Sequence, residues 1–256
     1  MRFTPSRRLV SGLALLALAV SLTGCIKFKQ ATTVMPDRSG KMEFTVAYNK
    51  QLFEQMGAQE DPTDDFSPQK MSEETQGFVA FSEPTKEEKE GWVYYKFAGF
   101  FEDINKVVLS DEEEGKKTTY IIEEKGGKSV MTINNGMLKS MAGEMGENEP
   151  QDPQQKAMMA PMMAGMEISE SYKLPGKVSD APKLFESDGR STSLSMNDRD
   201  VLDGEKPKKI AAIESMTVSF SGNDVPDAEF AAFKKEMEAA KAYWEKMKKE
   251  AGQDSE

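Results

Sequence analysis

The chain has 256 residues, a formal net charge of −11, no histidine and one cysteine. The absence of histidine excludes Ser-His-Asp and Cys-His catalysis and the usual histidine zinc site, and the acidic charge disfavours nucleic acid as a partner. We therefore expect a protein that is not an enzyme, binds no nucleic acid and uses neither a metal ion nor a cofactor.

The first 24 residues have the pattern of an export signal. Three arginines precede an apolar run at residues 9–20, which is too short to cross a bilayer core of about 30 Å. The signal ends in Leu22-Thr23-Gly24-Cys25, which resembles the bacterial lipobox, where the cysteine is acylated and the chain is cut before it. An ordinary secretory signal with an incidental cysteine is the alternative, but that would leave an unpaired thiol outside the cell. We predict a signal peptide at 1–24, a lipid anchor at Cys25 and a place in the cell envelope on the extracytoplasmic side of a membrane, with the outer membrane or cell surface favoured.

A β-hairpin is predicted directly after the anchor. Alternating apolar and polar residues indicate strands at 26–35 and 41–48. The segment between them, Pro36-Asp37-Arg38-Ser39-Gly40, is a typical turn. Two short helices should follow, with Asn49 and Ser67 as their N-caps.

The middle of the chain is predicted to contain further strands. In chain order, the pattern predicts a strand at 78–82, a charged turn at 83–90, a strand at 91–100, a helical turn at 103–109, and a hairpin of strands 118–124 and 128–133 that turns at Lys125-Gly126-Gly127. The strand at 91–100 has apolar residues on both faces, so we expect it to be buried on both sides.

Residues 134–165 interrupt the strand pattern. They are rich in methionine, glycine and proline, and we expect a helical or mobile insertion. The elements predicted after it are strands at 166–174, 191–196 and 210–220, with an acidic surface turn at 197–205, and a helix from about 226 to 250. The acidic turn does not have EF-hand spacing, so it predicts no calcium site.

The order of these parts resembles that of uncharacterised bacterial lipoproteins with an LppM-type domain. The resemblance rests on the lipobox, the Pro36–Gly40 turn, Trp92-Val93-Tyr94-Tyr95, Leu174-Pro175-Gly176-Lys177-Val178 and Asp188-Gly189-Arg190. Arg38 stands where such turns more often have glycine. The resemblance implies one α+β domain over residues 25–222, a location in the envelope and binding of an envelope lipid or glycolipid. It implies no catalytic residue.

Methionines in and just after the insertion recur at helical spacing. They are Met137, Met141 and Met145, then Met158, Met159, Met162, Met163 and Met166. Thioether side chains are suited to an adaptable apolar surface and are also soft ligands for Cu(I). The commoner alternative is that both groups are amphipathic helices packed on the sheet. We predict that an apolar or lipid-like ligand binds between the sheet and these methionines.

The C-terminal helix, at residues 223–256, has one apolar stripe. Its members follow a spacing of three and four residues: Phe230, Phe233, Met237, Ala240, Trp244 and Met247. We expect the stripe to pack on the protein's own domain, and the alternative is an envelope scaffold that binds another protein through this helix. The predicted fold class is therefore α+β: an antiparallel sheet of hairpins with short helices, a Met-rich insertion and a C-terminal amphipathic helix.

Overall fold

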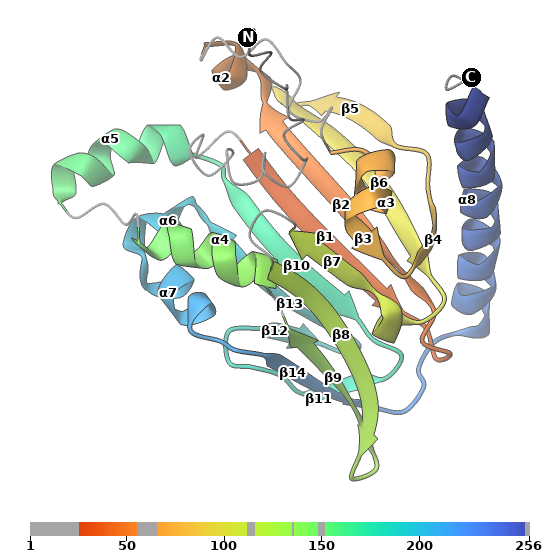
Figure 1. The fold of residues 1–256 in the computed structure, drawn as a ribbon. Coiled ribbons are helices and arrows are strands. Elements are labelled where there is room, and N and C mark those ends of the chain that lie inside the picture. The colour runs from red at the N-terminus through yellow and green to blue at the C-terminus, as the bar shows by residue number, and fades with distance from the viewer. Residues whose placement is uncertain (1–25, 56–65, 112–115, 135, 148–151, 254–256) are drawn as a thin grey trace, which may run out of the picture.

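The computed structural model describes residues 26–55, 66–111, 116–134, 136–147 and 152–253. The predicted signal peptide and Cys25 lie outside the described residues. The described chain forms two β-sheets, several short helices and one long C-terminal helix (Figure 1). The predicted α+β class is confirmed.

The larger sheet has eight strands. Their order is β12 (Glu186–Asp188), β13 (Ser191–Asn197), β10 (Glu167–Lys173), β1 (Ile26–Val34), β2 (Gly40–Asn49), β6 (Trp92–Phe101) and β4 (Phe78–Phe81), with β5 (Thr85–Lys89) also paired to β6. The predicted first hairpin is β1 and β2. Neighbouring strands run antiparallel except β1 and β10, which are parallel.

The smaller sheet has six strands, and all of its pairs are antiparallel. Their order is β11 (Lys177–Asp180), β14 (Met216–Ser221), β9 (Lys128–Asn134), β8 (Lys116–Lys125), β7 (Val108–Asp111) and β3 (Thr75–Gln76). The predicted second hairpin is β8 and β9. Its turn places Gly126 and Gly127 at positive φ, which glycine adopts without a steric penalty.

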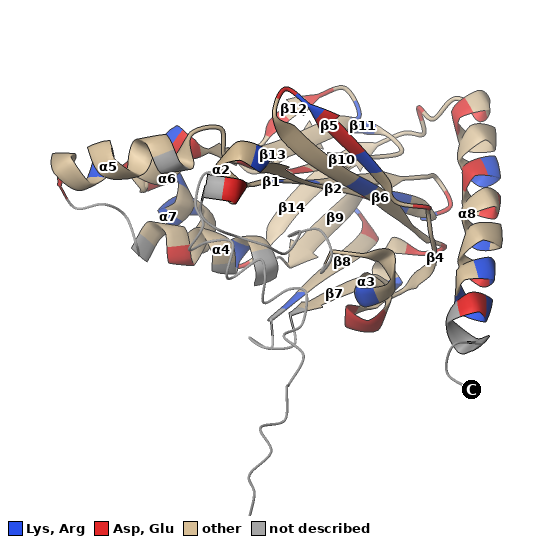
Figure 2. Ribbon diagram, turned by 90° about the horizontal axis from the view of Figure 1, so that it is seen from above, with Lys and Arg blue, Asp and Glu red and all other residues tan. Residues whose placement is uncertain are grey.

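The two sheets pack face to face, and Figure 2 shows the two layers from above. Alternate residues of each strand point to the same side of a sheet, and those on the inner faces form one continuous apolar core. Its fully buried members include Phe44 and Phe101 from the larger sheet and Met131, Ile133 and Val218 from the smaller sheet. The prediction that β6 is buried on both sides is confirmed for its second half, Phe97 to Phe101, whereas most of its first half is half-buried or exposed.

Short helices lie around the sheets, and α8 runs beside β4. The helices are α2 (Lys50–Gln55), α3 (Pro68–Glu74), the 3-10 turn η1 (Ile104–Lys106), α4 (Gly136–Glu147), α5 (Pro153–Met163), α6 (Asp198–Asp203), α7 (Glu205–Ala211) and α8 (Asp227–Gln253). Both predicted caps are confirmed, because the Asn49 and Ser67 side chains accept hydrogen bonds from the backbone N–H groups of Leu52 (3.2 Å) and Lys70 (3.4 Å). The predicted insertion is helical in its described part, as α4 and α5.

The prediction of a charged turn at 83–90 was wrong, because most of this segment is the strand β5. All five residues of β5 are exposed, and they pair with the first half of β6. A strand is held by backbone hydrogen bonds, and an edge strand exposed to water tolerates charged side chains on both faces. Its side chains therefore lacked the apolar alternation by which strands are recognised.

The predicted elements around residues 197–215 also need correction. The acidic turn is the helix α6, which begins with a capping box between Asn197 and Asp200 and ends at Gly204 with φ of 72°. The predicted strand at 210–220 starts only at Met216, because α7 occupies its first residues. The predicted helical turn at 103–109 is shorter, since β7 begins at Val108. The strands β11 and β12 were not predicted.

Candidate functional site

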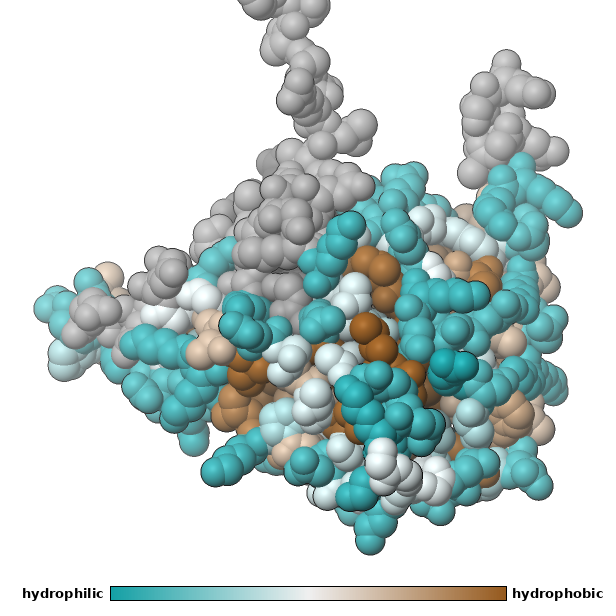
Figure 3. Space-filling model, turned by 60° about the horizontal axis from the view of Figure 1, so that its bottom comes forward, coloured by the Kyte–Doolittle hydropathy of each residue, from teal (hydrophilic) through white to brown (hydrophobic). Residues whose placement is uncertain are grey.

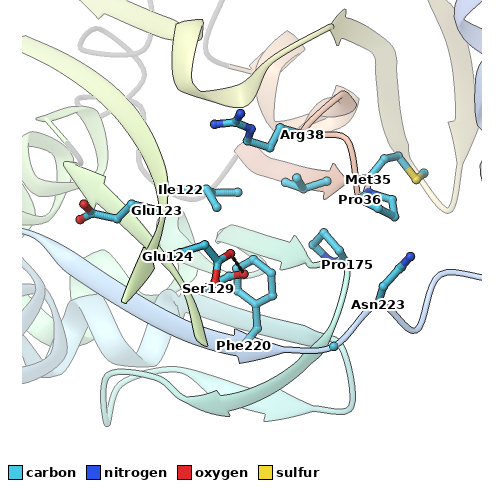
Figure 4. Close-up of a pocket in the computed structure, with 12 residues that line it drawn as sticks. Met35, Pro36, Arg38, Ile122, Glu123, Glu124, Ser129, Pro175, Phe220 and Asn223 are labelled. Atoms are coloured by element: carbon cyan, nitrogen blue, oxygen red, sulfur yellow. Dashed lines mark hydrogen bonds between the residues drawn. The ribbon is translucent and has the colours of Figure 1, made fainter. Parts of the chain in front are cut away.

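A cleft of about 350 Å³ opens between the two sheets at the end that holds the β1–β2 turn (Figure 4). Four segments meet there: that turn, the end of the β8–β9 hairpin, the loop after β10 and the residues that follow β14. The lining residues are Val34, Met35, Pro36, Arg38, Ile122, Glu123, Glu124, Ser129, Pro175, Phe220, Gly222 and Asn223. The volume is within the usual range of small-molecule sites, about 300–1,000 Å³.

Close backbone approach holds the loop after β10 against the end of β14. A Cβ atom on Gly176 would lie 2.2 Å from the carbonyl oxygen of Ser221, so a larger residue could not be placed there without moving the backbone. Pro175, on the cleft wall, also accepts a hydrogen bond at its carbonyl oxygen from the backbone N–H of Asp224 (2.8 Å). The Pro-Gly pair of the sequence therefore shapes one wall of the cleft.

The floor of the cleft is apolar and its rim is polar. Val34, Ile122 and Phe220 form a buried floor contributed by both sheets. The rim carries the exposed Arg38 on one side of Ile122, and the exposed Glu124 with the half-buried Ser129 on the other (Figure 4). Such a surface is suited to a ligand with an apolar part and a polar part.

Figure 3 shows the molecule with its lower end turned forward, and apolar side chains are visible there among polar ones. Single exposed apolar residues are normal on a protein surface, and only a continuous patch calls for an explanation. The large apolar residues that are strongly exposed among the described ones are Val79, Ile121 and Met158. None of the three lines the cleft, so the apolar surface of this site is its recessed floor.

Beneath the floor lies a buried polar cluster. Thr32 and Tyr120 are the next inward-facing residues beyond Val34 and Ile122, about 7 Å deeper along their strands. Their neighbours are Gln30, Glu170 and Tyr172, and all five are buried. The Gln30 amide donates to the Tyr120 hydroxyl (3.0 Å), and the Tyr172 hydroxyl donates to Glu170 (2.9 Å).

None of these five residues lines the cleft, and Glu170 contributes a buried carboxyl group. Burial, together with the charge of Glu170, raises the pKa of both tyrosine hydroxyls, so they remain protonated donors. Among the described residues, Gln30 Oε1 and Thr32 Oγ1 have no hydrogen-bond partner. A buried acceptor of this kind is most often satisfied by an internal water, and we assign the cluster no further role.

The predicted methionine site lies away from this cleft. Met145, Met163 and Met166 are buried in the core, Met141 and Met159 are partly buried, and Met158 is 69% exposed. The side chains of Met137 and Met162 lie outside the described residues. A crevice beside Leu138 of α4 has a volume of only about 10 Å³, which is room for one water at most. Helix α4 packs against α7 and β8, and α5 packs against α6. A ligand role for these methionines stays a prediction.

The predicted stripe of the C-terminal helix is packed on the larger sheet. Phe233, Met237, Ala240 and Trp244 are all less than 9% exposed, and Phe230 is partly buried. The Phe233 ring stacks on Phe100 with centroids 6.3 Å apart, and Trp244 meets Phe81 edge-on at 5.2 Å. Packing on the protein's own domain is thus what the structure shows, and binding of a partner through these residues stays a prediction.

Two sequence motifs around the cleft also attach α8. Lys234 pairs with Asp37 in the β1–β2 turn (2.8 Å), and Glu229 pairs with Arg190 of the Asp-Gly-Arg segment (3.1 Å). Hydrogen bonds from Lys173 and then Arg190 lower the pKa of Glu229, so this carboxyl is ionised and paired at neutral pH. These two of the motifs that carried the family resemblance therefore help to hold α8 against the domain.

The cleft was not predicted from the sequence. Its residues come from four segments that are distant in the chain, and no single motif contains more than a few of them. The signal that pointed toward it was indirect: the Pro36–Gly40 turn and Pro175-Gly176 both mark chain reversals, and both lie at the same end of the paired strands β1 and β10.

No family model matches the chain, and no curated protein matches it. Among solved structures, the chain is similar to the folded domain of the LppM protein of Mycobacterium tuberculosis, determined by NMR. The TM-score is 0.37 with 11% sequence identity, and the match covers 79% of this chain and 92% of that chain. A likeness at this level shows no shared function.

The described residues hold no group of three or more His, Cys, Asp or Glu side chains that could bind a metal ion. None of the helices in the described ranges is long and apolar enough to cross a membrane. The expectation that the whole chain uses no metal ion or cofactor stays a prediction.

Proposed function

We propose that this protein is a lipid-anchored, non-catalytic component of the cell envelope that binds a small amphipathic ligand in the cleft between its sheets. The observation that carries the proposal is the cleft itself, with about 350 Å³ of space over an apolar floor and inside a polar rim. The lipid anchor rests on the lipobox-like sequence that ends at Cys25. The absence of histidine and of a second cysteine supports a binding role rather than catalysis.

The anchor and the cleft would lie at opposite ends of β1. Ile26, the residue after Cys25, is already paired with Tyr48 of β2, so an acylated Cys25 would hold the domain against the membrane without a linker. The β1–β2 turn lies at the far end of the nine-residue strand β1, about 30 Å away. The cleft would therefore open away from the anchoring membrane, and its ligand would enter from the aqueous side.

The alternative, an envelope scaffold that binds another protein through α8, has less support. The apolar stripe of α8 is occupied by Phe81 and Phe100 of the same chain. A partner would have to bind the charged outer face of the helix (Figure 2). Such a face is solvated at little cost, so nothing about it requires a partner.

A tryptophan at Ser129 should block the cleft. Ser129 lies directly opposite Phe220 in the β9–β14 pair, so a large side chain there would cover the apolar floor. In the mature Cys25→Ser chain, which has no lipid of its own, we expect Ser129→Trp to weaken binding of the fluorescent probe N-phenyl-1-naphthylamine by about tenfold or more. Fluorescence titration measures this effect.

The matched control is Ser195→Trp, because Ser195 is an exposed serine on the outer side of β13. This variant should bind the probe as the parent does, and thermal melts should show that both variants are folded. Equal binding by the parent and Ser129→Trp would show that the probe binds elsewhere and would remove the support for cleft binding.

A further inference from the structure

Arg38 has a backbone conformation that residues with a side chain rarely adopt. Its φ is 66°, in the left-handed region. The turn requires this, because Met35 accepts from the Arg38 N–H (2.9 Å) and donates to the Ser39 carbonyl (2.7 Å), which closes a tight loop. Glycine would adopt this conformation without a steric penalty. The position therefore carries an arginine against the preference of its own backbone.

The other residue of this kind in the described chain is Glu90, with φ of 54°. It lies in the exposed turn between β5 and β6 and lines no part of the cleft. Turn geometry thus explains the positive φ at both positions. The difference is that the Arg38 side chain lies on the rim of the cleft.

The guanidinium of Arg38, on the rim of the cleft, forms no hydrogen bond or ion pair with another described residue. Its neighbour Asp37 is held by Lys234 (2.8 Å) and by Ser39. Across the cleft, Glu124 accepts a hydrogen bond from Ser129, and Glu123 pairs with Lys125. The acidic groups near the cleft are thus engaged with other residues, whereas Arg38 has its donors available.

We propose that Arg38 binds an anionic group of the ligand, a carboxylate or a phosphate, while the apolar part of the ligand covers Val34, Ile122 and Phe220. This inference rests on the proposed function and specifies its ligand as an anionic amphiphile. A guanidinium presents two parallel N–H donors to a carboxylate or phosphate, which gives geometric specificity as well as charge. The carboxylate of Glu124 on the other side of the rim would disfavour a second negative charge there and so set the orientation of the ligand.

The test compares two probes with the same chain and opposite head groups, decanoate and decyltrimethylammonium, by calorimetry on the mature Cys25→Ser chain. Decyl phosphate as a third probe distinguishes phosphate from carboxylate as the preferred group. We expect decanoate or decyl phosphate to bind about tenfold more tightly than the cation. Arg38→Gln and Arg38→Gly should abolish this preference, and Arg38→Lys should keep part of it.

The charge-matched control is Arg199→Gln, because Arg199 is an exposed arginine on α6, away from the cleft. It should keep the full preference for the anion. Arg38→Gly should also melt at a higher temperature than Arg38→Gln, because glycine relieves the left-handed conformation. A variant that is more stable and yet binds the anion less tightly separates a binding role from a structural one.

Two outcomes overturn the inference in different ways. If Arg38→Gly binds the anionic probes as tightly as the parent while Ser129→Trp does not, the cleft binds a ligand but Arg38 does not select it. If the parent shows no preference for anions, or binds no probe, the ligand class is wrong, and in the second case the proposed function fails with it.

Discussion

Phe233→Ala should lower the free energy of unfolding by about 3–5 kcal/mol, the usual cost of emptying a buried phenylalanine site. Phe233 is 3% exposed and stacks on Phe100, which is itself fully buried in the larger sheet. The substitution would leave a cavity between α8 and the sheet. Urea denaturation of the mature Cys25→Ser chain, with sedimentation to confirm that it is monomeric, measures the loss.

Phe230→Ala is the matched control, because Phe230 is one turn earlier on the same helix but only partly buried. Its effect should be clearly smaller. A monomer whose unfolding is unchanged by Phe233→Ala would mean that the apolar stripe of α8 is not buried on this domain in solution. The scaffold alternative would then have the better support.

Cys25→Ser in the full precursor should abolish lipid attachment and block cleavage before residue 25. A serine hydroxyl cannot replace the thiol that takes the diacylglyceryl group in lipobox proteins, and the chain has no other cysteine. Because each buried CH₂ of an acyl chain contributes about 0.8 kcal/mol, loss of the anchor should release the protein from membranes. Mass spectrometry of the mature N-terminus and membrane fractionation measure both effects, and an unmodified N-terminus at any other residue would end the anchor hypothesis.

Acylation of Cys25 also makes it possible to measure whether the cleft opens away from the anchoring membrane. Once Cys25 is acylated, an engineered cysteine is the only thiol available for an environment-sensitive fluorophore. A label at Gln51→Cys, in α2 near the start of β1, should be quenched by brominated lipids, and a label at Asn223→Cys, on the cleft rim, should not. Stronger quenching at the rim would show that the cleft opens toward the membrane.

Elements with a strong local pattern could be predicted from the sequence, and elements held by distant contacts could not. The hairpin of β1 and β2 and the stripe of α8 follow from residue periodicity, because one face of each must be buried. The strand β5 was missed because all of its residues are exposed, and α6 was missed because an Asn197–Asp200 capping box, rather than an apolar stripe, defines it.

The candidate site could not be predicted from the sequence, for a different reason. The spacing of the methionines correctly indicated helices, but helical spacing does not say whether a side chain meets a ligand or the core. Arg38 was noticed only as an unusual turn residue. Its place at a cleft depends on Ile122, Pro175 and Phe220, and only the pairing of distant strands brings these residues beside it.

Native mass spectrometry of the acylated protein, extracted from its own envelope in a mild detergent, tests cleft binding most directly. We expect the wild-type protein to retain a non-covalently bound anionic amphiphile that is lost from Ser129→Trp and kept by Ser195→Trp. A wild-type protein without any bound molecule, or the same added mass on Ser129→Trp, would contradict the proposal that the cleft is the binding site.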